Sequence, residues 1–292
     1  MNSVAAAHYQ HRLCRVLEYI DTHLDEELSV DRLSSVAAFS KFHFHRQFSE
    51  FSGINVSKFI QLTRLNRAAY QLAYRDLAIT EIALGCGYEN VESFSRAFKK
   101  NTAQTPSEFR VQPQWHTWFN TYQSARALRM NHMIASTTPQ VNIITTSDIK
   151  VAVLEHRGDP DMLDHSIRKF IAWRKQHQLP PGKFATFNIA YHDPETVEAG
   201  EYQFDLCVAT NMDITGNTIG IVNKIIPGGR CAVLRHLGSD DLLRSSVHYL
   251  YSEWLPHSGE ELRDFPLYWQ RVKFFPDVPE HEAVVDIFLP LK

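Results

Sequence analysis

Residues 79–110 of this chain are ITEIALGCGYENVESFSRAFKKNTAQTPSEFR, and their pattern decides the fold of the N-terminal part. Apolar residues at helical spacing begin the stretch, and Gly85-Cys86-Gly87 interrupts that first helix. A second helix is predicted to begin at Glu89 or Asn90, with an apolar stripe of Val91, Phe94, Ala97 and Phe98. The opposite face is polar or charged and presents Asn90, Glu92, Ser93, Arg96, Lys99 and Lys100. Two short helices around a glycine turn, the second with a cationic outer face, indicate a helix-turn-helix.

The same pattern occurs once earlier, at residues 30–52. Ser29 is suited to cap a first helix, and Ser40 is suited to cap a second helix that ends at Gly53. The second helix has an apolar face made by Phe44, Phe48 and Phe51. Its outward residues are Lys41, Phe42, His45, Arg46 and Ser49. We therefore expect two helix-turn-helix units in tandem.

Between the two units, residues 57–76 form a strongly apolar helical pattern without glycine or proline. A helix of this length spans about 30 Å, close to the roughly 34 Å between successive major-groove faces on one side of B-DNA. A rigid connector could therefore present both units to one face of a duplex. Residues 41–110 contain ten Lys/Arg and six Asp/Glu, an excess of four positive charges. This modest excess predicts few phosphate contacts and an affinity for DNA that falls as salt rises.

The overall composition is that of a globular protein with more than one domain: 292 residues, 44% hydrophobic and 22% charged. No apolar run approaches the roughly 18 residues of a membrane span, and the N-terminus has no secretory pattern. The four cysteines, Cys14, Cys86, Cys207 and Cys231, lack metal-ligand or redox spacing, which favours reduced thiols in a cytoplasmic protein. The net charge is −3, so a DNA-binding surface must come from local clustering.

These motifs resemble the DNA-binding domain of the AraC/XylS family over roughly residues 8–112. The resemblance rests on FSKFHFHRQFSEFSG at 39–53, RLNRA at 64–68 and IALGCGYENVESFSRAFKKNTAQTPSEFR at 82–110. It implies an all-α DNA-binding domain over residues 1–112 of a transcription regulator. Its implied partners are double-stranded DNA at promoters and RNA polymerase, and its implied role is activation.

The resemblance also implies that bases are contacted from the outward face of the second helix in each unit. In the first unit these residues are Phe42, His45 and Arg46, with Lys41 near phosphate. In the second unit they are Asn90, Glu92, Ser93 and Arg96, with Lys99 and Lys100 nearer the backbone. Relatives often carry Trp in place of Phe42 and Gln in place of His45 and Glu92, so we expect a different DNA sequence. Core packing of Phe42 and a merely solvated role for Lys99 and Lys100 are the structural alternatives.

The second half of the chain has a different residue pattern. Residues 113–140 mix polar residues with aromatic ones and are expected to form an irregular or partly helical linker whose aromatics dock on a domain. Beyond it lies an internal repeat, in which VAVLEHRGDPDML at 151–163 aligns with CAVLRHLGSDDLL at 231–243. We predict an α+β domain over residues 141–292, built from two β-α-β-β units around a pseudo-twofold axis with a cleft between them.

This half resembles the GyrI-like effector-binding domain over about residues 140–292. The resemblance rests on the repeat cores, AYHDPE at 190–195, PGGRCA at 227–232 and DIFLPL at 286–291. It implies an aromatic cavity, which in drug-binding members also holds a glutamate for cationic ligands; this chain has Gln270 at that position. A neutral amide cannot supply the charge, which favours a neutral or anionic small-molecule effector, or none. The predicted lining residues are Tyr191, Phe204, Trp254, Tyr268, Trp269 and Gln270, with core packing as the alternative for each.

No catalytic motif is recognisable, since the chain lacks a glycine-rich phosphate loop, G-x-S-x-G and H-E-x-x-H. Fifteen histidines are scattered, and His156 and His236 recur with the repeat, which favours structural roles over a metal site. We therefore expect no cofactor, no metal and no catalytic residue. Two alternatives stay open for the second half: a hydrolase that retains the cleft, and a protein-interaction module.

Overall fold

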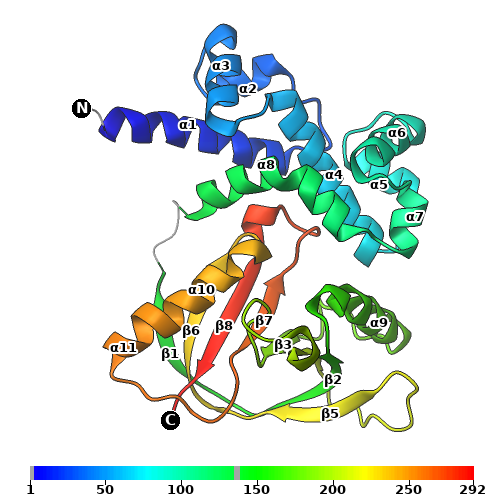
Figure 1. The fold of residues 1–292 in the computed structure, drawn as a ribbon, viewed down its shortest axis with the longest axis vertical. Coiled ribbons are helices and arrows are strands. Elements are labelled where there is room, and N and C mark those ends of the chain that lie inside the picture. The colour runs from blue at the N-terminus through cyan, green and yellow to red at the C-terminus, as the bar shows by residue number, and fades with distance from the viewer. Residues whose placement is uncertain (1–2, 135–138) are drawn as a thin grey trace. The chain divides into compact units, whose positions relative to one another are not determined.

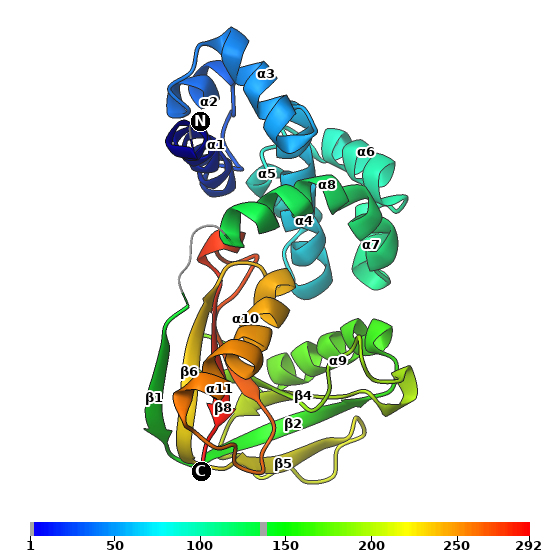
Figure 2. The same cartoon turned by 60° about the vertical axis from the view of Figure 1, so that its left-hand side comes forward.

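The chain divides into two compact units (Figures 1 and 2). The computed structural model describes residues 3–134 and 139–292, with the backbone alone at residues 3–7 and 131–134. One unit comprises Met1–Thr137 with Phe275–His281, and the other comprises Thr138–Phe274 with Glu282–Lys292. Residues 3–134 form helices and the second unit combines a sheet with helices, so the predicted multidomain fold class is confirmed.

The first unit contains both predicted helix-turn-helix units, α2–α3 and α5–α6 (Figure 1). Its helices are α1 (Ser3–Thr22), α2 (Val30–Val36), α3 (Lys41–Ser52), α4 (Val56–Tyr74), α5 (Ile79–Gly85), α6 (Val91–Thr102), α7 (Pro106–Val111) and α8 (Trp115–Ile134). One hydrophobic core runs through all of them and includes the inward phenylalanines of α3 and α6. The apolar stripes read from the sequence therefore converge on a single core.

Local caps determine where these helices begin and end. The Ser29 hydroxyl accepts the backbone N–H of Arg32, and the Ser40 hydroxyl accepts that of His43. Gly53 ends α3 with φ of +70°, a left-handed conformation that favours glycine. Both serine caps and the glycine stop agree with the prediction, because capping depends on residues within one helical turn.

Helix α4 is the predicted connector, and its buried side holds the first unit together. Leu65 is fully buried, and Asn66 accepts a hydrogen bond from the indole N–H of Trp118 at 3.0 Å. Arg64 donates from Nε to the Leu24 carbonyl at 2.9 Å and from Nη2 to the Glu26 carbonyl at 2.7 Å. The RLNRA motif at 64–68 thus fixes α4 against the α1–α2 loop and α8.

Gly87 lies in the turn between α5 and α6 at a point where no side chain fits. Its φ is +71°, and a Cβ atom there would overlap the guanidinium of Arg64 and the carbonyl oxygen of Leu24. Gly85, two residues earlier, has open space around the same position. The turn therefore requires glycine at Gly87 for two separate reasons, positive φ and close approach.

The segment expected to be a linker differs in the structure. Trp115–Ile134 is one continuous helix, α8, and it packs on α3, α4 and α6 within the first unit. Trp118 is fully buried and Tyr122 is nearly so, which agrees with the expectation that aromatics of this segment dock on a domain. Of the two alternatives expected for residues 113–140, irregular or partly helical, α8 agrees with the helical one, because burial of these rings stabilises a helix of mixed sequence.

The second unit contains an antiparallel sheet whose strand order is internally symmetric, and the sheet is seen in Figure 2. Its strands are β1 (Val141–Thr146), β2 (Ile149–Arg157), β3 (Thr186–Ala190), β4 (Gln203–Ala209), β5 (Ile221–Ile226), β6 (Gly229–Leu237), β7 (Tyr268–Lys273) and β8 (Val284–Pro290). Their order is β1-β6-β8-β7-β3-β4-β2-β5. The counterparts in the two copies are β1 and β5, β2 and β6, β3 and β7, and β4 and β8. Exchanging each strand with its counterpart and reading the order backwards gives the same order. This symmetry agrees with the predicted pseudo-twofold, and each copy has one strand more than predicted, β1 or β5.

The two faces of the sheet carry separate apolar clusters. One face is covered by α9 (Leu163–Gln176), α10 (Leu243–Tyr249), a π-helical turn (Leu250–Trp254) and α11 (Leu255–Ser258). On the opposite face, the helix-free face, a smaller cluster includes Val153, Phe187, Cys207 and Tyr268. Side chains alternate between these faces along each strand, so neighbouring residues serve different clusters.

Two histidines occupy matching positions in the repeat and make matching hydrogen bonds. His156 contacts Ser166 Oγ through Nδ1 at 2.9 Å and the Asp159 carbonyl through Nε2 at 3.1 Å. His236 contacts Ser246 Oγ at 2.9 Å and the Ser239 carbonyl at 2.9 Å in the same way. Since a carbonyl only accepts, Nε2 donates, and a neutral ring accepts the serine proton at Nδ1. Each histidine therefore ties a strand end to the helix that follows, which is the scaffold role predicted for the pair.

Gly87→Ala should lower the free energy of unfolding of the first unit by about 1–3 kcal/mol, through backbone strain and the overlap with Arg64. Gly85→Ala is the matched control and should be neutral or stabilising by up to about 1 kcal/mol, because Gly85 is helical and unobstructed. Urea unfolding followed by circular dichroism measures both. Equal effects of the two substitutions would contradict the close approach at Gly87.

The second unit should lose stability as the pH falls below about 6.5. Burial lowers the pKa of His236 below its ordinary value, so the unfolded chain takes up a proton before the folded chain does. Hydrogen exchange of residues 229–246 at pH 7 and pH 5.5 measures the change. The pH dependence should diminish in His236→Gln and persist in a control, His165→Gln, because His165 is exposed on α9.

Candidate nucleic-acid interface and ligand site

The outer face of α3 presents the residues predicted to contact bases. Phe42 is 90% exposed, whereas Phe44 and Phe48 beneath it are fully buried, so the core alternative for Phe42 was wrong. His45 and Arg46 are exposed on the same helix. An exposed aromatic ring is suited to pack on a thymine methyl group.

Lys41, predicted to lie near phosphate, begins α3 and forms an ion pair with Asp31 at 2.5 Å. Both side chains are more than half exposed, so this pair contributes little to stability. A phosphate can therefore compete with Asp31 for the lysine at small cost.

The beginning of α6 uses two of the predicted base-contacting residues for capping. Asn90 Oδ1 accepts the backbone N–H of Ser93 at 2.8 Å, and Ser93 Oγ donates to the Asn90 carbonyl at 2.9 Å. Both residues therefore have a local structural role that the sequence prediction did not include. The cap occupies the Asn90 side-chain oxygen and leaves the amide nitrogen as its donor toward a base.

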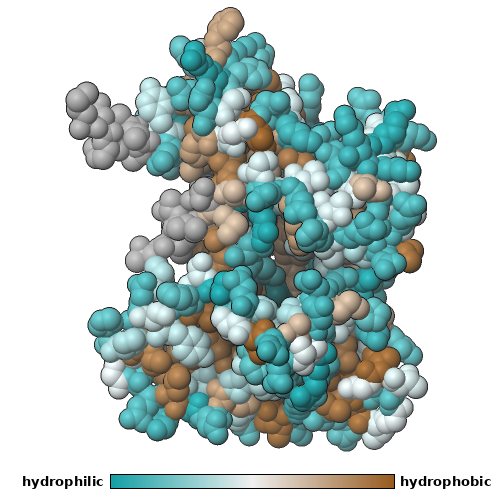
Figure 3. All heavy atoms as spheres, viewed as in Figure 1, coloured by the Kyte–Doolittle hydropathy of each residue, from teal (hydrophilic) through white to brown (hydrophobic). Residues whose placement is uncertain are grey.

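Further along α6, Arg96, Lys99 and Lys100 are all exposed, and hydrophilic residues predominate over this helix in Figure 3. Within the described ranges, no acceptor holds the Arg96 guanidinium. Glu92 lies in the first turn of α6 and the two lysines lie in the last turn. At these ends their charges interact favourably with the helix dipole. These three charges thus have a structural explanation beside the predicted one, whereas Arg96 does not.

Lys58 is a cation near this surface that the sequence analysis did not single out. It lies on α4, and its ammonium donates to Asn101 Oδ1 at the end of α6 at 2.7 Å. Burial and the charge of Lys100 lower the pKa of Lys58, which places the two cations close together. Nothing in the sequence near Lys58 indicates this, because Asn101 and Lys100 are more than 40 residues away.

In the second unit, the six predicted lining residues lie on both faces of the sheet. Phe204 and Trp269 belong to the helix-covered cluster, with ring centroids 5.5 Å apart, and Trp254 packs against the same cluster. Tyr268 and Tyr191 belong to the cluster on the helix-free face, and Gln270 follows Tyr268 by two residues on β7. The expectation of one common pocket is therefore corrected, because strand alternation separates Trp269 from Tyr268 and Gln270.

Trp269 has a further structural role on the helix-covered side. Its indole N–H donates to Asn188 Oδ1 at 3.0 Å, and the same oxygen accepts from Arg271 Nε at 2.9 Å. Tyr268 stacks on Phe288 with centroids 4.8 Å apart and is fully buried. Both rings are thus core residues in this structure, whereas Gln270 and Tyr191 are half-buried.

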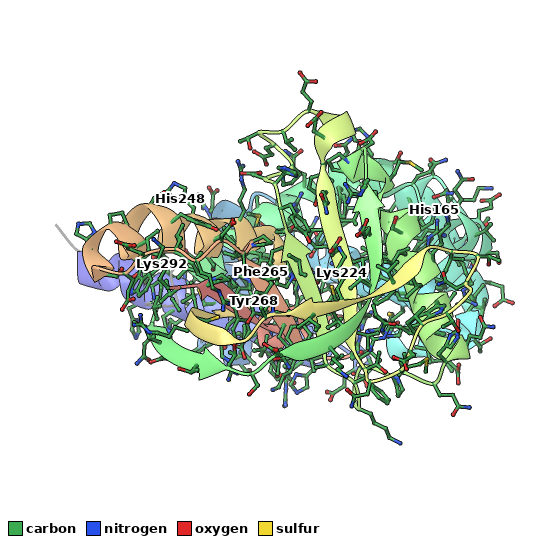
Figure 4. All side chains as sticks on the ribbon, turned by 90° about the horizontal axis from the view of Figure 1, so that it is seen from below. His165, Lys224, His248, Phe265, Tyr268 and Lys292 are labelled. Atoms are coloured by element: carbon green, nitrogen blue, oxygen red, sulfur yellow. The ribbon has the colours of Figure 1, made fainter. Side chains whose placement is uncertain are left out.

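A charged cluster on the helix-free face was not predicted from the sequence. Asp205 on β4 is fully buried, and its Oδ2 atom accepts from Tyr191 at 3.0 Å and from the Lys224 ammonium at 2.7 Å. Lys224 also contacts Glu155 Oε1 at 2.6 Å. Figure 4 views the protein from below and shows Lys224 on β5, with Phe265 and Tyr268 toward the middle of the view.

The charged groups in this cluster shift one another's pKa values. Burial alone would lower the pKa of Lys224, but hydrogen bonds to Asp205 and Glu155 raise it above its ordinary value. The Lys224 hydrogen bond lowers the pKa of Glu155. Burial and the neighbouring Asp205 carboxylate raise the pKa of Tyr191 to about 12. Around neutral pH Lys224 is therefore an ammonium, Glu155 a carboxylate and Tyr191 a neutral phenol.

The aligned repeat did contain one signal of this cluster. Glu155 in the first copy stands where Arg235 stands in the second, a reversal of charge inside an otherwise similar motif. The partners Asp205 and Lys224 lie on other strands, so the contact itself follows from the strand order.

A separate groove of about 450 Å³ lies beside α9 and residues 215–219. Trp173 and His177 stack in its wall with centroids 4.5 Å apart. None of the six predicted lining residues borders this groove.

Across residues 3–134 and 139–292, no three His, Cys, Asp or Glu side chains are grouped so that they could hold a metal ion. None of the helices in these ranges has the length and apolar character needed to cross a membrane.

Comparison with known proteins identifies both halves. The GyrI-like small molecule binding domain matches residues 139–292, and a helix-turn-helix domain matches residues 33–112. The probable transcriptional regulator YgiV of Escherichia coli K12 is 37% identical over 155 residues, which cover 53% of this chain and 97% of YgiV. The right origin-binding protein of Escherichia coli K12 is 36% identical over 100 residues, which cover 34% of this chain and 35% of that protein.

Among solved structures, the EcmrR–DNA complex determined by cryo-EM is 14% identical with a TM-score of 0.44, covering 90% of this chain and 98% of that chain. The two resemblances drawn from the sequence motifs agree with the two domain matches. Since one match covers more than half of the chain and YgiV is matched over nearly its whole length, this chain belongs to the GyrI-like family and carries an AraC-type helix-turn-helix domain in its first half.

Proposed function

We propose that this protein is a transcription regulator that reads two successive major-groove segments of a promoter and senses a small molecule with its second unit. The observation that carries the proposal is the pair of helix-turn-helix units joined by the single helix α4, each with an exposed outer face. Arg46 on α3 and Arg96 on α6 are the principal base-contacting residues, because a guanidinium bonds guanine O6 and N7 with two hydrogen bonds.

The remaining contacts divide between bases and backbone. Phe42 and His45 complete the first reading face, and Asn90, Glu92 and Ser93 complete the second. Lys41, Lys99 and Lys100 neutralise phosphates, and Lys58 adds a cation beside Lys100. Glu92 repels phosphate unless it meets a cytosine amine, so it also restricts which base pair is accepted.

The protein acts as an activator in contact with RNA polymerase in the cytoplasm, a role that rests on the resemblance to the AraC/XylS family. The second unit is a binding domain rather than an enzyme. Support comes from Gln270, which leaves the position of the family's glutamate uncharged, and from the family's description as small-molecule binding. Tyr191 and Gln270 remain candidates for ligand contact because both are half-buried on the helix-free face.

Arg96→Ala should relax specificity at one base pair by about 1–3 kcal/mol, because a base contact is lost from a single position. Lys99→Ala, one helical turn away, should weaken binding to all sequences similarly and reduce the salt dependence by about one phosphate contact. Selection of binding sites from random DNA by the full chain, followed by titration at several salt concentrations, measures both.

Uniform weakening by Arg96→Ala would make Arg96 a phosphate contact and reverse its assignment. If the unmodified chain selects no preferred sequence, the DNA-reading function itself is wrong. Circular dichroism of each variant is the control, since both side chains are exposed and neither substitution should unfold α6.

A small-molecule effector should raise the thermal midpoint of the full chain. Binding to the folded state alone stabilises by about 2.7 kcal/mol when the free ligand is a hundredfold above its dissociation constant. A metabolite library screened by thermal shift and calorimetry tests the sensing role. Turnover of a bound compound would instead favour a hydrolase, and absence of any binder together with capture of a protein partner would favour an interaction module.

A further inference from the structure

The first unit includes a segment from far along the chain. Phe275–His281, called the β7–β8 segment below, belongs to the same compact unit as the helices of Met1–Thr137. The segment follows β7 and leads into β8, two strands that are neighbours within the sheet. The chain itself therefore connects these strands to the unit that contains both helix-turn-helix units.

The β7–β8 segment holds the C-terminal end of α4. Arg75, the residue that caps α4, donates from Nε and Nη2 to the two carboxylate oxygens of Asp277, each at 2.7 Å. A two-point contact of this kind fixes direction as well as distance. Earlier on α4, the ring of Tyr70 meets the ring of Phe275 edge-on, with centroids 4.9 Å apart. Because α4 joins the two helix-turn-helix units, these contacts act on the element that sets their separation.

The same segment reaches a buried ion pair formed by α1 and α8. Asp21 of α1 and Arg129 of α8 are paired, and each is 6% exposed. Glu280 Oε2 lies 3.4 Å from Arg129 Nη1, and His281 Nδ1 lies 3.4 Å from Asp21 Oδ2. Burial alone would raise the pKa of Asp21, but Arg129 and His281 lower it. Charges in such a site depend strongly on their neighbours, because little solvent screens them.

The first copy of the repeat makes the corresponding connection with different residues. Each connection ends in a 3-10 turn, Ala199–Glu201 in the first copy and Glu280–Glu282 in the second. Aligned on these turns, the counterparts of Asp277, Glu280 and His281 are Thr196, Ala199 and Gly200. Joining the two strands therefore requires neither the acids nor the histidine, and the second copy has them for another reason.

We propose that the β7–β8 segment is a strap through which the second unit controls DNA reading. It braces α4 against α1 and α8, and a ligand that displaces β7 or β8 moves the strap and changes the separation of the reading helices α3 and α6. The inference rests on the proposed regulator function and adds the route that couples its two roles.

A proposed ligand contact lies on the strand that leads into the strap. Gln270 is half-buried on β7, which ends at Lys273, and the strap begins at Phe275. Coupling between two sites requires a physical element whose arrangement both sites bias. A strand that carries a ligand contact and continues into the brace of α4 meets that requirement within one stretch of chain.

The brace is tested in the full chain, without DNA, by giving the strap two residues of the first copy. In Asp277→Thr with Glu280→Ala, hydrogen exchange of residues 70–74 should be about tenfold faster, because Arg75 and Arg129 each lose a carboxylate partner. Asp277→Asn keeps the shape but loses the charge, and it should give a smaller increase in the same residues. Unchanged exchange in the double variant would overturn the inference.

Asp193→Ala is the matched control. Asp193 lies in the corresponding connection of the first copy, and its Oδ2 atom accepts from Arg244 Nε and Nη2 at 3.2 and 3.0 Å. The substitution removes a similar exposed ion pair, so hydrogen exchange of α4 should stay the same. An equal acceleration in α4 would indicate a general loss of stability and would contradict the strap.

The coupling is tested with the DNA site that the unmodified full chain selects from random sequences. Because coupling between sites is reciprocal, bound DNA should slow hydrogen exchange of β7 and β8 by at least about fivefold. The double variant should lose this protection at saturating DNA, whereas Asp193→Ala should retain it. A brace that is merely structural predicts no protection of the strands by DNA, and that result would refute the strap.

Failure of the strap is distinguishable from failure of the regulator function. If the unmodified chain selects no DNA sequence, the regulator function is wrong and the strap is refuted with it. If the chain selects a site but bound DNA leaves exchange of β7 and β8 unchanged, the strap alone is refuted.

Discussion

The contact of Arg64 with the α1–α2 loop beneath Gly87 is the constraint on which the first unit depends. Arg64 projects from the connecting helix, donates to two backbone carbonyls, and fills the space in which a Cβ of residue 87 would lie. Helix α6 begins four residues after that glycine, so the direction of α6 depends on a side chain of α4. A reading helix held in this way can address a fixed segment of groove.

The same core positions α3 and α6 through repeated physical means. Phe44 and Phe48 bury one side of α3, and Phe94 and Phe98 bury one side of α6, which leaves the opposite sides in solvent. Exposure of Phe42 and Arg96 follows from helical periodicity once those inner residues are buried. The proposed function therefore arises from the amphipathic pattern, with caps at Ser40 and Asn90 setting where each outer face begins.

In the second unit, the two repeat copies share the fold of the sheet and differ in the charged residues that they carry. The strand order and the paired histidines are common to both copies. The facing acids Glu155 and Asp205 are confined to the first copy, and their pairing with Lys224 brings together three strands. The second copy has an ion pair of Arg235 and Asp286 at the position where the first copy has two facing acids. The ion pair is the arrangement that sheet stability alone favours.

By itself, the sequence determined the tandem helix-turn-helix pattern, the connecting helix, the duplicated sheet and both families, because periodicity, caps and repeats are local properties. Tertiary structure alone decided that residues 115–134 form a helix of the first unit and that Asn90 and Ser93 serve a cap as well as an outer face. It also decided that Trp269 and Gln270, adjacent in sequence, serve opposite faces of the sheet. The charged cluster at Asp205 was beyond the sequence because strand order and register, set by burial of apolar side chains across the whole sheet, bring its members together.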